Sequence, residues 1–278
     1  MIATEILKGQ GLGNQLFCYV STRCIALDRN LPFGIKDTGW LGDKRYNSSG
    51  MYWFNLDLGE VVPDGLRIYE EKCTRKKTNA CWHDSVIGCD IRDYDEDLIN
   101  VEDNTMIFGI MQHEKYFIHH KEKIKQWLKV RSEYDCFDYS NSDICILNFR
   151  GGEYVGFNEL YLKREYWINA MKNMKNINPN MKFIIITDDV KSADKMLPEI
   201  PAYHFDVGKD YSIIKNAHYL IVSNSSFAFF PSFTSDTLKF AIAPKYWARH
   251  NVSDGYWSTN QNVYSHFSYQ DRSGVLND

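Results

Sequence analysis

A polar loop near the middle of the chain holds the residues best suited to bind an anion. Residues 144–147, Ile-Cys-Ile-Leu, form an apolar run that is too short for a helix and predicts a buried strand. Asn148, Arg150 and Glu153 then lie at or just past the carboxyl end of that strand, where ligands bind in open α/β sheets. The Arg150 guanidinium offers a planar fork of donors that matches a phosphate. The alternative is that Arg150 is a surface arginine in an ordinary strand-to-helix loop.

Three further polar groups follow expected strands in the second half of the chain. They are Asp188 with Asp189, then Asp206, and then residues 223–226, Ser-Asn-Ser-Ser. The carboxyl ends of parallel strands meet at one edge of a sheet, so these groups and Arg150 are expected to share that edge. Together they predict a nucleotide site.

Each of these groups has a specific part to play in such a site. Ser225 and Ser226 can cap a helix and present hydroxyl and N–H donors to a phosphate. Asp206 can accept hydrogen bonds from a guanine edge or from a ribose. The alternative is that Ser225 and Asp206 only cap their own helices.

A glycine-bearing loop follows the first expected strand. Residues 9–14 read Gly-Gln-Gly-Leu-Gly-Asn and resemble the dinucleotide pattern G-x-G-x-x-G, except that Asn14 stands where the third glycine belongs. That glycine lets the helix pack closely on the strand, and an amide side chain does not replace it, so NAD binding is disfavoured. Asn14 is a fair N-cap for the next helix, whose first turn would leave backbone donors facing a ligand.

No metal-binding or P-loop pattern stands out in the sequence. Asp188 and Asp189 are adjacent, so their side chains are expected to diverge on extended backbone. Cys73, Cys81 and Cys89 recur every eight residues, a spacing that matches no zinc site. There is no G-x-x-x-x-G-K-[ST] loop either. The sequence therefore predicts no metal site and no cofactor.

Strands and helices are expected to alternate, which predicts an α/β fold with doubly wound parallel sheets. Strands are predicted at residues 2–7, 31–36, 105–111, 144–147, 183–187, 202–205, 219–222 and 240–243. Helices are predicted at residues 14–28, 163–177, 190–197 and 209–216, and another follows residues 112–117 and runs to about residue 130. Residues 39–104 are interpreted as loops and short helices. The expected domains are residues 1–140 and 141–245, with the tail of residues 246–278 packing back on the first domain.

The composition narrows the class of protein. The 278 residues are 44% hydrophobic and 24% charged, as in a soluble globular protein. A net charge of -4 argues against nucleic-acid binding, which normally requires a basic surface. Seven cysteines without metal spacing suggest reduced thiols and a cytoplasmic location. No apolar stretch is long enough for a membrane span, although peripheral association with a membrane stays open.

Several motifs, taken in order, resemble glycosyltransferase family 11, the α-1,2-fucosyltransferases. Residues 11–17, Gly-Leu-Gly-Asn-Gln-Leu-Phe, resemble its G-x-G-N-Q-x-F signature, and residues 109–117 resemble its G-x-x-Q-x-x-x-Y-F segment. Its H-x-R-R-x-D motif falls on residues 148–153, Asn-Phe-Arg-Gly-Gly-Glu. A strand ending in Asp-Asp matches residues 188–189, and a serine–aromatic stretch matches residues 225–230.

The resemblance implies a GT-B-like fold of two Rossmann-like halves and an inverting, metal-independent fucosyl transfer from GDP-fucose to a glycan. The acceptor would be an oligosaccharide or a lipid-linked glycan. The residues expected to bind the nucleotide sugar are Gly11, Gly13, Gln15, Asn148, Asp188, Asp206, Ser225, Ser226 and Phe227. Arg150, Glu153 and Asn14 are the expected catalytic residues, with Arg150 stabilising the leaving diphosphate and Glu153 as the candidate base.

The departures from the family pattern lie in the motif of residues 148–153. Asn148 replaces the histidine, Gly151 the second arginine, and Glu153 the aspartate. The related protein O-fucosyltransferases have one arginine in this motif, so Arg150 alone can serve. Two alternatives stay open: a degenerate protein that binds a nucleotide sugar or glycan without catalysis, and a transferase that uses a different GDP-sugar.

Overall fold

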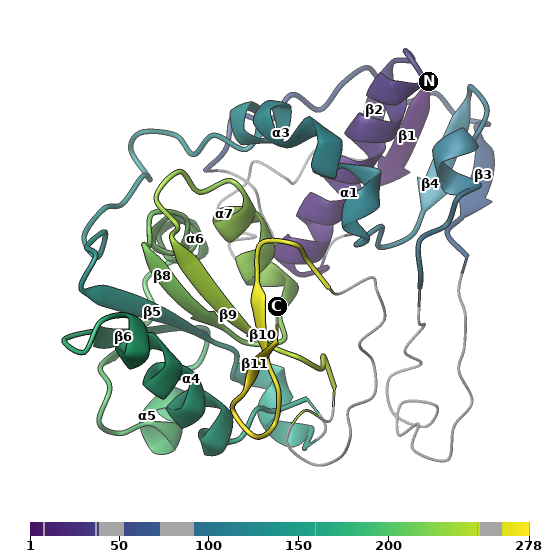
Figure 1. Ribbon diagram of the computed structural model, residues 1–278. Coiled ribbons are helices and arrows are strands. Elements are labelled where there is room, and N and C mark those ends of the chain that lie inside the picture. Colours follow the sequence, from purple (N-terminus) through teal and green to yellow (C-terminus); the bar gives the residue numbers. More distant parts are fainter. Residues whose placement is uncertain are drawn as a thin grey trace, which may run out of the picture. The chain divides into compact units, whose positions relative to one another are not determined.

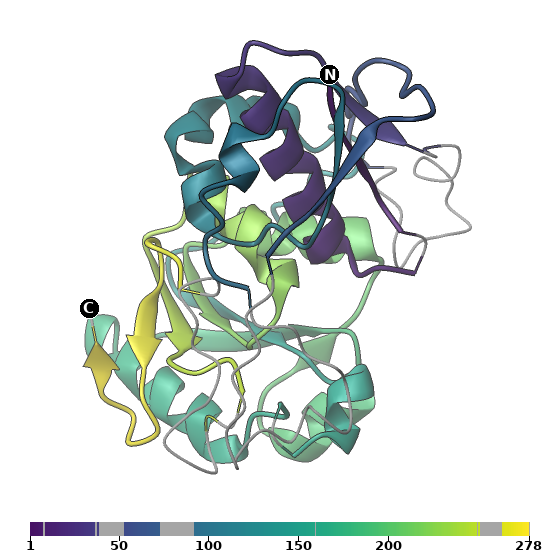
Figure 2. The ribbon, with the colours of Figure 1, turned by 90° about the vertical axis from the view of Figure 1, so that its right-hand side faces the viewer.

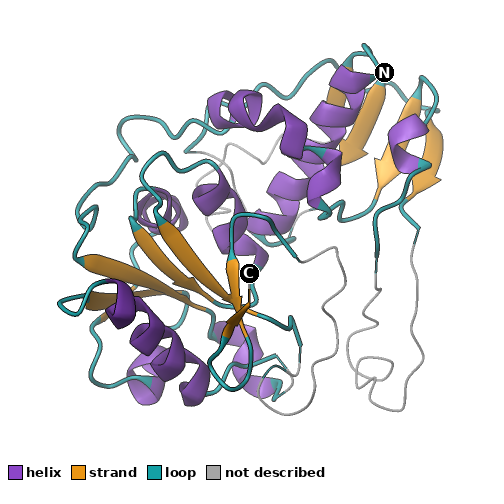
Figure 3. Cartoon of the chain, in the orientation of Figure 1, coloured by secondary structure: helices purple, strands orange, loops and turns teal. Residues whose placement is uncertain are grey.

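The computed structural model describes residues 1–7, 9–36, 38, 53–72, 92–158, 160–248, 250 and 263–277. These residues form two α/β units, each built on a largely parallel sheet (Figure 1, Figure 3). Unit 1 comprises Met1–Arg131 and Thr259–Tyr264, and unit 2 comprises Ser132–Ser258 and Ser265–Asp278. The predicted fold class, α/β with two Rossmann-like, GT-B-like halves, is confirmed. No helix among the described residues is both long and apolar enough to cross a membrane.

The sheet of unit 1 has four parallel strands in the order β2-β1-β4-β3. Its elements are β1 (Ile2–Glu5), α1 (Leu12–Asp28), β2 (Phe33–Lys36), β3 (Arg67–Glu70), η3 (Leu98–Asn100), β4 (Thr105–Phe108), η4 (Glu114–Tyr116), η5 (Ile118–His120) and α3 (Lys121–Trp127). Helix α1, dark purple in Figure 2, connects β1 to β2 and packs on both strands. This β-α-β start is the one that the sequence predicts.

Helix α1 begins two residues earlier than expected. Its N-cap is Gly11, in extended conformation and without a side-chain cap, so Asn14 lies inside the first turn. The helix is buried on nearly every side over most of its length, including Gln15 and Phe17. Packing within the unit, and not a polar cap, therefore sets where this helix starts.

Two expectations for unit 1 are wrong. The helix expected to run to about residue 130 is divided into two 3-10 turns, η4 and η5, and the short helix α3. Strand β3 lies within residues 39–104, which the sequence predicts to be loops and short helices. It is an edge strand with three of its four residues exposed, so it lacks the alternation of apolar and polar residues that marks a half-buried strand.

The sheet of unit 2 has seven strands in the order β11-β10-β9-β8-β5-β6-β7. Strands β5 to β10 are parallel, and β11 pairs antiparallel with β10. The elements are β5 (Ile144–Phe149), η6 (Gly152–Gly156), α4 (Arg164–Ile177), β6 (Lys182–Thr187), α5 (Val190–Met196), β7 (Ala202–Tyr203), α6 (Val207–Lys215), β8 (Tyr219–Val222), η7 (Ser226–Ala228), α7 (Phe229–Phe233), β9 (Phe240–Pro244), β10 (Ser268–Gln270) and β11 (Leu276–Asn277). In chain order from β5, the six parallel strands are arranged 3-2-1-4-5-6, as in a Rossmann fold.

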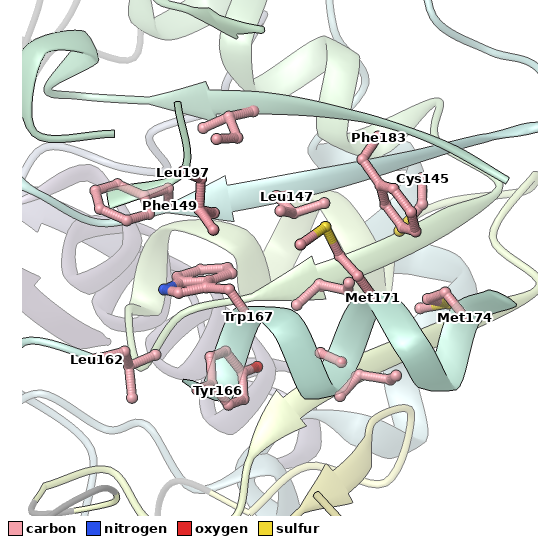
Figure 4. Packing of buried hydrophobic residues seen from close by; sticks show 14 of the residues in the cluster. Cys145, Leu147, Phe149, Leu162, Tyr166, Trp167, Met171, Met174, Phe183 and Leu197 are labelled. Carbon is pink, nitrogen blue, oxygen red and sulfur yellow. The ribbon is translucent and has the colours of Figure 1, made fainter. Parts of the chain in front are cut away.

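The central strand β5 contributes to both hydrophobic cores of unit 2. Cys145, Leu147 and Phe149 pack with helix α4 on one face, as Figure 4 shows, whereas Ile146 packs with α6 on the other. Successive side chains of a strand point to opposite faces, so a strand covered on both faces is apolar throughout. This burial fixes the position of the loop that follows β5.

The C-terminal tail divides between the two units. Tyr264 stacks on Phe17 of unit 1, with ring centroids 6.0 Å apart. Strand β10 instead extends the sheet of unit 2 beside β9, and Gln270 donates to the Tyr166 carbonyl of α4. The prediction that the whole tail packs on the first half is thus corrected for residues 246–248, 250 and 265–277, which belong to unit 2. The short strands of residues 265–277 complete the second sheet.

Candidate functional site

The strand order of unit 2 reverses between β5 and β8. From β5 the chain adds β6 and β7 on one side and then returns to place β8 on the other. The crevice beyond the carboxyl ends of two strands at such a reversal is where open α/β sheets bind ligands. The loops after β5 and after β8 are therefore the candidate site of this unit.

Arg150 follows β5 directly and is held by two carboxylates. One guanidinium nitrogen donates to Asp188, and Nη2 donates to Glu153 Oε1 at 2.8 Å. The guanidinium carbon also lies 5.3 Å from the centre of the Tyr154 ring. The Arg150 side chain is 30% exposed, Asp188 is 32% exposed and Glu153 is 69% exposed. Arg150, Glu153 and Asp188 thus come together as predicted, on the surface and already paired.

The two glycines after Arg150 fit against the paired aspartates after β6. Gly151 N–H donates to Asp188 at 2.9 Å, and Gly152 N–H donates to Asp189 at 3.3 Å. A Cβ atom at Gly151 would lie only 2.6 Å from the Asp189 Cβ, and Gly152 has a positive φ of 48°. The sequence predicts that the two aspartate side chains diverge, but both accept hydrogen bonds from this loop. The same contact explains why the second arginine of the family motif has no room here.

The loop after β8 faces the loop after β5 across the strand-order reversal. Tyr154 donates from its hydroxyl to the Asn224 carbonyl at 3.4 Å, which links the two loops. Ser225 caps the short helix η7 by accepting from Phe227 N–H, and Ser226 is its first residue. Within the described residues, the buried Ser223 Oγ and Asn224 Oδ1 have no hydrogen-bond partner. Such atoms normally have a partner, so the polar groups at this edge are not all satisfied within the described residues, although both atoms are buried.

Two predicted site residues do not join this group, and a third, Phe227, joins it through its backbone N–H. Asp206 caps helix α6 by accepting from Lys209 N–H at 2.8 Å, two strands away from β5 at the edge strand β7. Asn148 is 6% exposed inside β5, and its amide lies 3.5 Å from the Ile186 carbonyl. Phe227 is partly buried against the core beneath η7. For Asp206 the structure favours the helix-capping alternative.

The strand order of unit 1 reverses between β1 and β4. The loop after β1 holds Gly11, and the first turn of α1 holds Gly13 and Asn14. The loop after β4 holds Gln112, whose amide donates to Asn14 Oδ1 at 2.7 Å. Two sequence motifs that are 98 residues apart thus meet at this reversal.

Gln15 is fully buried beside this contact. Its amide nitrogen donates to the Gln10 carbonyl at 2.6 Å. The buried Oε1 atoms of Gln10 and Gln15 have no partner among the described residues. Unit 1 therefore also has unpaired acceptors at its strand-order reversal, and here they are buried neutral amides.

A buried carboxylate supports the loop after β4. Glu71 accepts from the N–H groups of Ile110 and Met111 at 2.9 and 3.0 Å, and Arg92 lies 3.4 Å from the same oxygen. Burial raises the pKa of Glu71, and these donors and Arg92 oppose the rise. Glu71 thereby holds the backbone that carries Gln112 toward Asn14.

The sequence does not predict some of the residues that support the two sites. Gln112 lies within the motif of residues 109–117 and could have been chosen there. The sequence predicts Asp189 at the sheet edge, but its contact with Gly152 depends on the tertiary fold. Glu71 lies in the region that gave no readable pattern, so no local signal identified it.

Proteins that are similar to this chain in sequence or in structure include glycosyltransferases. No family model matches it. The α-1,2-colitosyltransferase of Escherichia coli is 26% identical over 267 residues, which cover 85% of this chain and 89% of that protein. Among solved structures, the NodZ α-1,6-fucosyltransferase co-crystallised with GDP has 13% identity and a TM-score of 0.49, with 84% of this chain and 92% of that chain covered. POFUT1 in complex with GDP-fucose has 9% identity and a TM-score of 0.45, covering 87% and 97%.

Proposed function

We propose that this chain is a glycosyltransferase that moves a sugar from a GDP-sugar to a hydroxyl group of a glycan acceptor. The observation that carries the proposal is Arg150 at the carboxyl end of β5, beside the strand-order reversal of a Rossmann-like sheet. The similarity to a colitosyltransferase along 85% of the chain supports the reaction class. The motifs that resemble glycosyltransferase family 11 support L-fucose as the donor sugar and an inverting α-1,2 transfer.

Arg150 meets the diphosphate of the donor by exchanging one of its carboxylate partners. Asp188 is the better fixed of the two, because it also accepts from Gly151 N–H. Glu153 is 69% exposed and makes its described contact only through the arginine, so a phosphate oxygen can take its place on Nη2. Arg150 then keeps Asp188 as an orienting partner and directs the rest of its fork to the leaving group.

The same exchange frees a carboxylate next to the reacting centre. Glu153 is our candidate for the base that takes the proton of the acceptor hydroxyl. In the reaction, the acceptor oxygen forms a bond to the anomeric carbon while the bond from that carbon to the diphosphate oxygen breaks. GDP leaves with the bonding electrons, and the proton passes to the base.

Unit 1 supplies neutral groups that suit the hydroxyls of a sugar. Asn14, Gln112 and the unpaired oxygens of Gln10 and Gln15 lie at its strand-order reversal. Neutral amides bind hydroxyl groups without the strong field that a diphosphate requires. We assign these residues to the donor sugar or to the glycan acceptor, an oligosaccharide or a lipid-linked glycan.

The proposed transfer needs no metal ion or other cofactor. Arg150 supplies the positive charge, and the N–H groups near Ser225 and Ser226 assist it. The enzyme would act in the cytoplasm, either free or in peripheral contact with a membrane.

A second donor has its own support. The curated relative is named as a colitosyltransferase, and colitose is fucose without its 3-hydroxyl group. A site that hydrogen-bonds the 3-hydroxyl of fucose discriminates strongly against colitose, which lacks it. An apolar site discriminates between the two sugars far less. Comparing kcat/KM for GDP-fucose and GDP-colitose identifies the donor.

Nucleotide binding tests the proposal directly. Calorimetry with GDP, UDP, CMP and NAD, each with EDTA present, should give binding for GDP alone. Loss of GDP binding in EDTA, or tight binding of NAD, would contradict the proposal. Release of GDP from GDP-fucose or GDP-colitose separates the enzyme from a protein that binds nucleotide sugars without catalysis, because such a protein would bind GDP and release none.

A further inference from the structure

Two histidines and one aspartate converge on unit 1 at the far end of helix α1 from Gly11. Asp28 is the last residue of α1, and His119 and His120 end the 3-10 turn η5. Helix α1 has 17 residues and is therefore about 25 Å long. This cluster is distinct from the strand-order reversal of unit 1, and the proposed transfer does not use it.

Both imidazoles present the same ring nitrogen to the same carboxylate. Nε2 of His120 lies 2.6 Å from Asp28 Oδ1, and Nε2 of His119 lies 2.9 Å from Asp28 Oδ2. The two ring centroids are 4.2 Å apart. One ligand atom from each residue falls within 4.8 Å of the others.

These distances are close to those that a metal ion requires. In a tetrahedral Zn²⁺ site with bonds of about 2.1 Å, neighbouring ligand atoms are roughly 3.4 Å apart. To admit an ion, each Nε2-to-oxygen distance would need to increase by less than roughly 1 Å. The His119 side chain is half-exposed, so it can move by this amount. His120 is only 15% exposed, which fixes one ligand in place.

The donor set indicates the kind of ion. Imidazole nitrogen suits Zn²⁺, Ni²⁺ and Co²⁺, whereas Mg²⁺ and Ca²⁺ prefer oxygen ligands. Three protein ligands leave a fourth tetrahedral position for water. Sequence patterns do not find this site, because Asp28 lies 91 residues before His119.

We propose that Asp28, His119 and His120 bind a divalent transition-metal ion of the Zn²⁺ type. The ion joins the end of α1 to η5 and stabilises unit 1, because a ligand that binds only the folded state shifts the unfolding equilibrium. Without the ion, the two imidazoles form hydrogen bonds with Asp28.

The test is a titration of the whole chain, free of affinity tags and stripped with EDTA, with ZnCl₂ in a calorimeter. The parent protein should bind one more Zn²⁺ than Asp28→Asn, His119→Ala or His120→Ala, or bind it at least tenfold more tightly. CoCl₂ should give visible absorption bands in the parent that weaken in each variant. Saturating Zn²⁺ should raise the Tm of the parent by more than that of the variants, and MgCl₂ should change neither.

His204→Ala is the matched control. His204 is also exposed and also contacts a carboxylate, Asp210 at 2.6 Å. Among the described residues, no second histidine joins it in a possible metal site. This variant should bind Zn²⁺ as the parent does. Zn²⁺ binding by the remaining histidines and cysteines is the same background in every protein compared. Equal stoichiometry, affinity and Co²⁺ spectra in the parent and the Asp28, His119 and His120 variants would overturn the proposal and leave only hydrogen bonds to Asp28.

Discussion

The two strand-order reversals carry opposite kinds of polar group. In unit 2 the loop after β5 is charged, with Arg150 between Asp188 and Glu153 on the surface. In unit 1 the groups that meet are the amides of Asn14 and Gln112, and the charge, Glu71, is buried beneath them. The backbone plan is shared, but the side chains are not.

Under the proposed function, the two kinds of polar group bind different parts of the substrates. A diphosphate carries concentrated charge and calls for a guanidinium fork. A sugar offers neutral hydroxyl groups, which amide donors and acceptors match without a charge. If the proposed division is right, substitutions in unit 2 should act on GDP, and those in unit 1 should act on transfer alone.

The largest effect is expected for Arg150→Ala. Without the guanidinium, the departing diphosphate loses its main positive partner. The value of kcat/KM should therefore fall more than a hundredfold, which corresponds to a loss of at least about 3 kcal/mol of transition-state stabilisation. Arg150→Lys keeps the charge but loses the fork and should also be strongly impaired. Steady-state kinetics with the GDP-sugar, beside a melting curve, checks both variants.

Arg164→Ala is the matched control for Arg150→Ala. Arg164 is a partly exposed arginine of the same unit and pairs with Glu199 at 2.6 Å. The Arg164→Ala variant should keep the turnover of the parent, because Arg164 takes no part in the proposed chemistry. It should also keep its stability, because an exposed ion pair contributes little to stability. Near-normal turnover of Arg150→Ala would mean that the diphosphate is bound elsewhere.

The next largest effect is expected for Gly151→Ala. The added Cβ would lie 2.6 Å from the Asp189 Cβ, so the loop must move away from the aspartates and carry Arg150 with it. Such overpacking costs roughly 1–3 kcal/mol, and GDP affinity should fall about tenfold. Urea unfolding and GDP calorimetry measure the two losses. Gly156→Ala, where the Cβ meets nothing within 4 Å, should change neither quantity, and equal behaviour of the two variants would refute the steric argument.

The second unit was the more predictable from sequence. Its strands are buried runs such as residues 183–187, each followed by polar residues, and β8 was predicted at its exact bounds. In unit 1 the short edge strand β3 is mostly exposed and gave no such signal. Strands are predicted well where burial on both faces makes them continuously apolar.

The site was predictable as a set of loops but not as a set of contacts. The sequence placed Arg150 and Asp188 at one sheet edge, and the structure pairs them. The role of Gly151 depends on Asp189, which lies 38 residues later in the chain. The role of Asn14 depends on Gln112, which lies 98 residues later. Contacts of this kind follow from strand order, which the periodicity of a single sequence does not determine.

A smaller effect is expected for the amide pair of unit 1. Asn14→Ala and Gln112→Ala each remove the same 2.7 Å hydrogen bond, so each should lower kcat/KM for transfer by about tenfold and leave GDP affinity unchanged. The double variant should lose little more than either single one, with a coupling of about 1 kcal/mol. The control is Asn100→Ala, because Asn100 is exposed and its amide donates to the Glu96 carbonyl of its own turn at 3.0 Å. Additive losses, or weaker GDP binding, would show that the pair does not act as one unit on the sugar.

The smallest effect is a contrast in pH dependence between the two loops. Burial raises the pKa of Glu71 above 4.5, so its contribution to the free energy of unfolding is fully present below pH 4.5 and is lost as the pH rises through the folded pKa. The hydrogen bond with Ser192 lowers the pKa of Asp189 below 3.8, and its contribution is present above pH 3.8 and lost as the pH falls through the folded pKa.

Urea unfolding of Glu71→Gln and Asp189→Asn between pH 3 and 7 checks both signs against the parent. The parent should lose stability relative to Glu71→Gln as the pH rises above about 4.5, because only the parent must ionise a buried carboxyl group. It should gain stability relative to Asp189→Asn as the pH rises toward 3.8, and the difference should then stay constant. If both differences changed in the same direction, the two loops would share one electrostatic environment. The contrast between the exposed charged loop after β5 and the buried carboxylate that supports the loop after β4 would then fail.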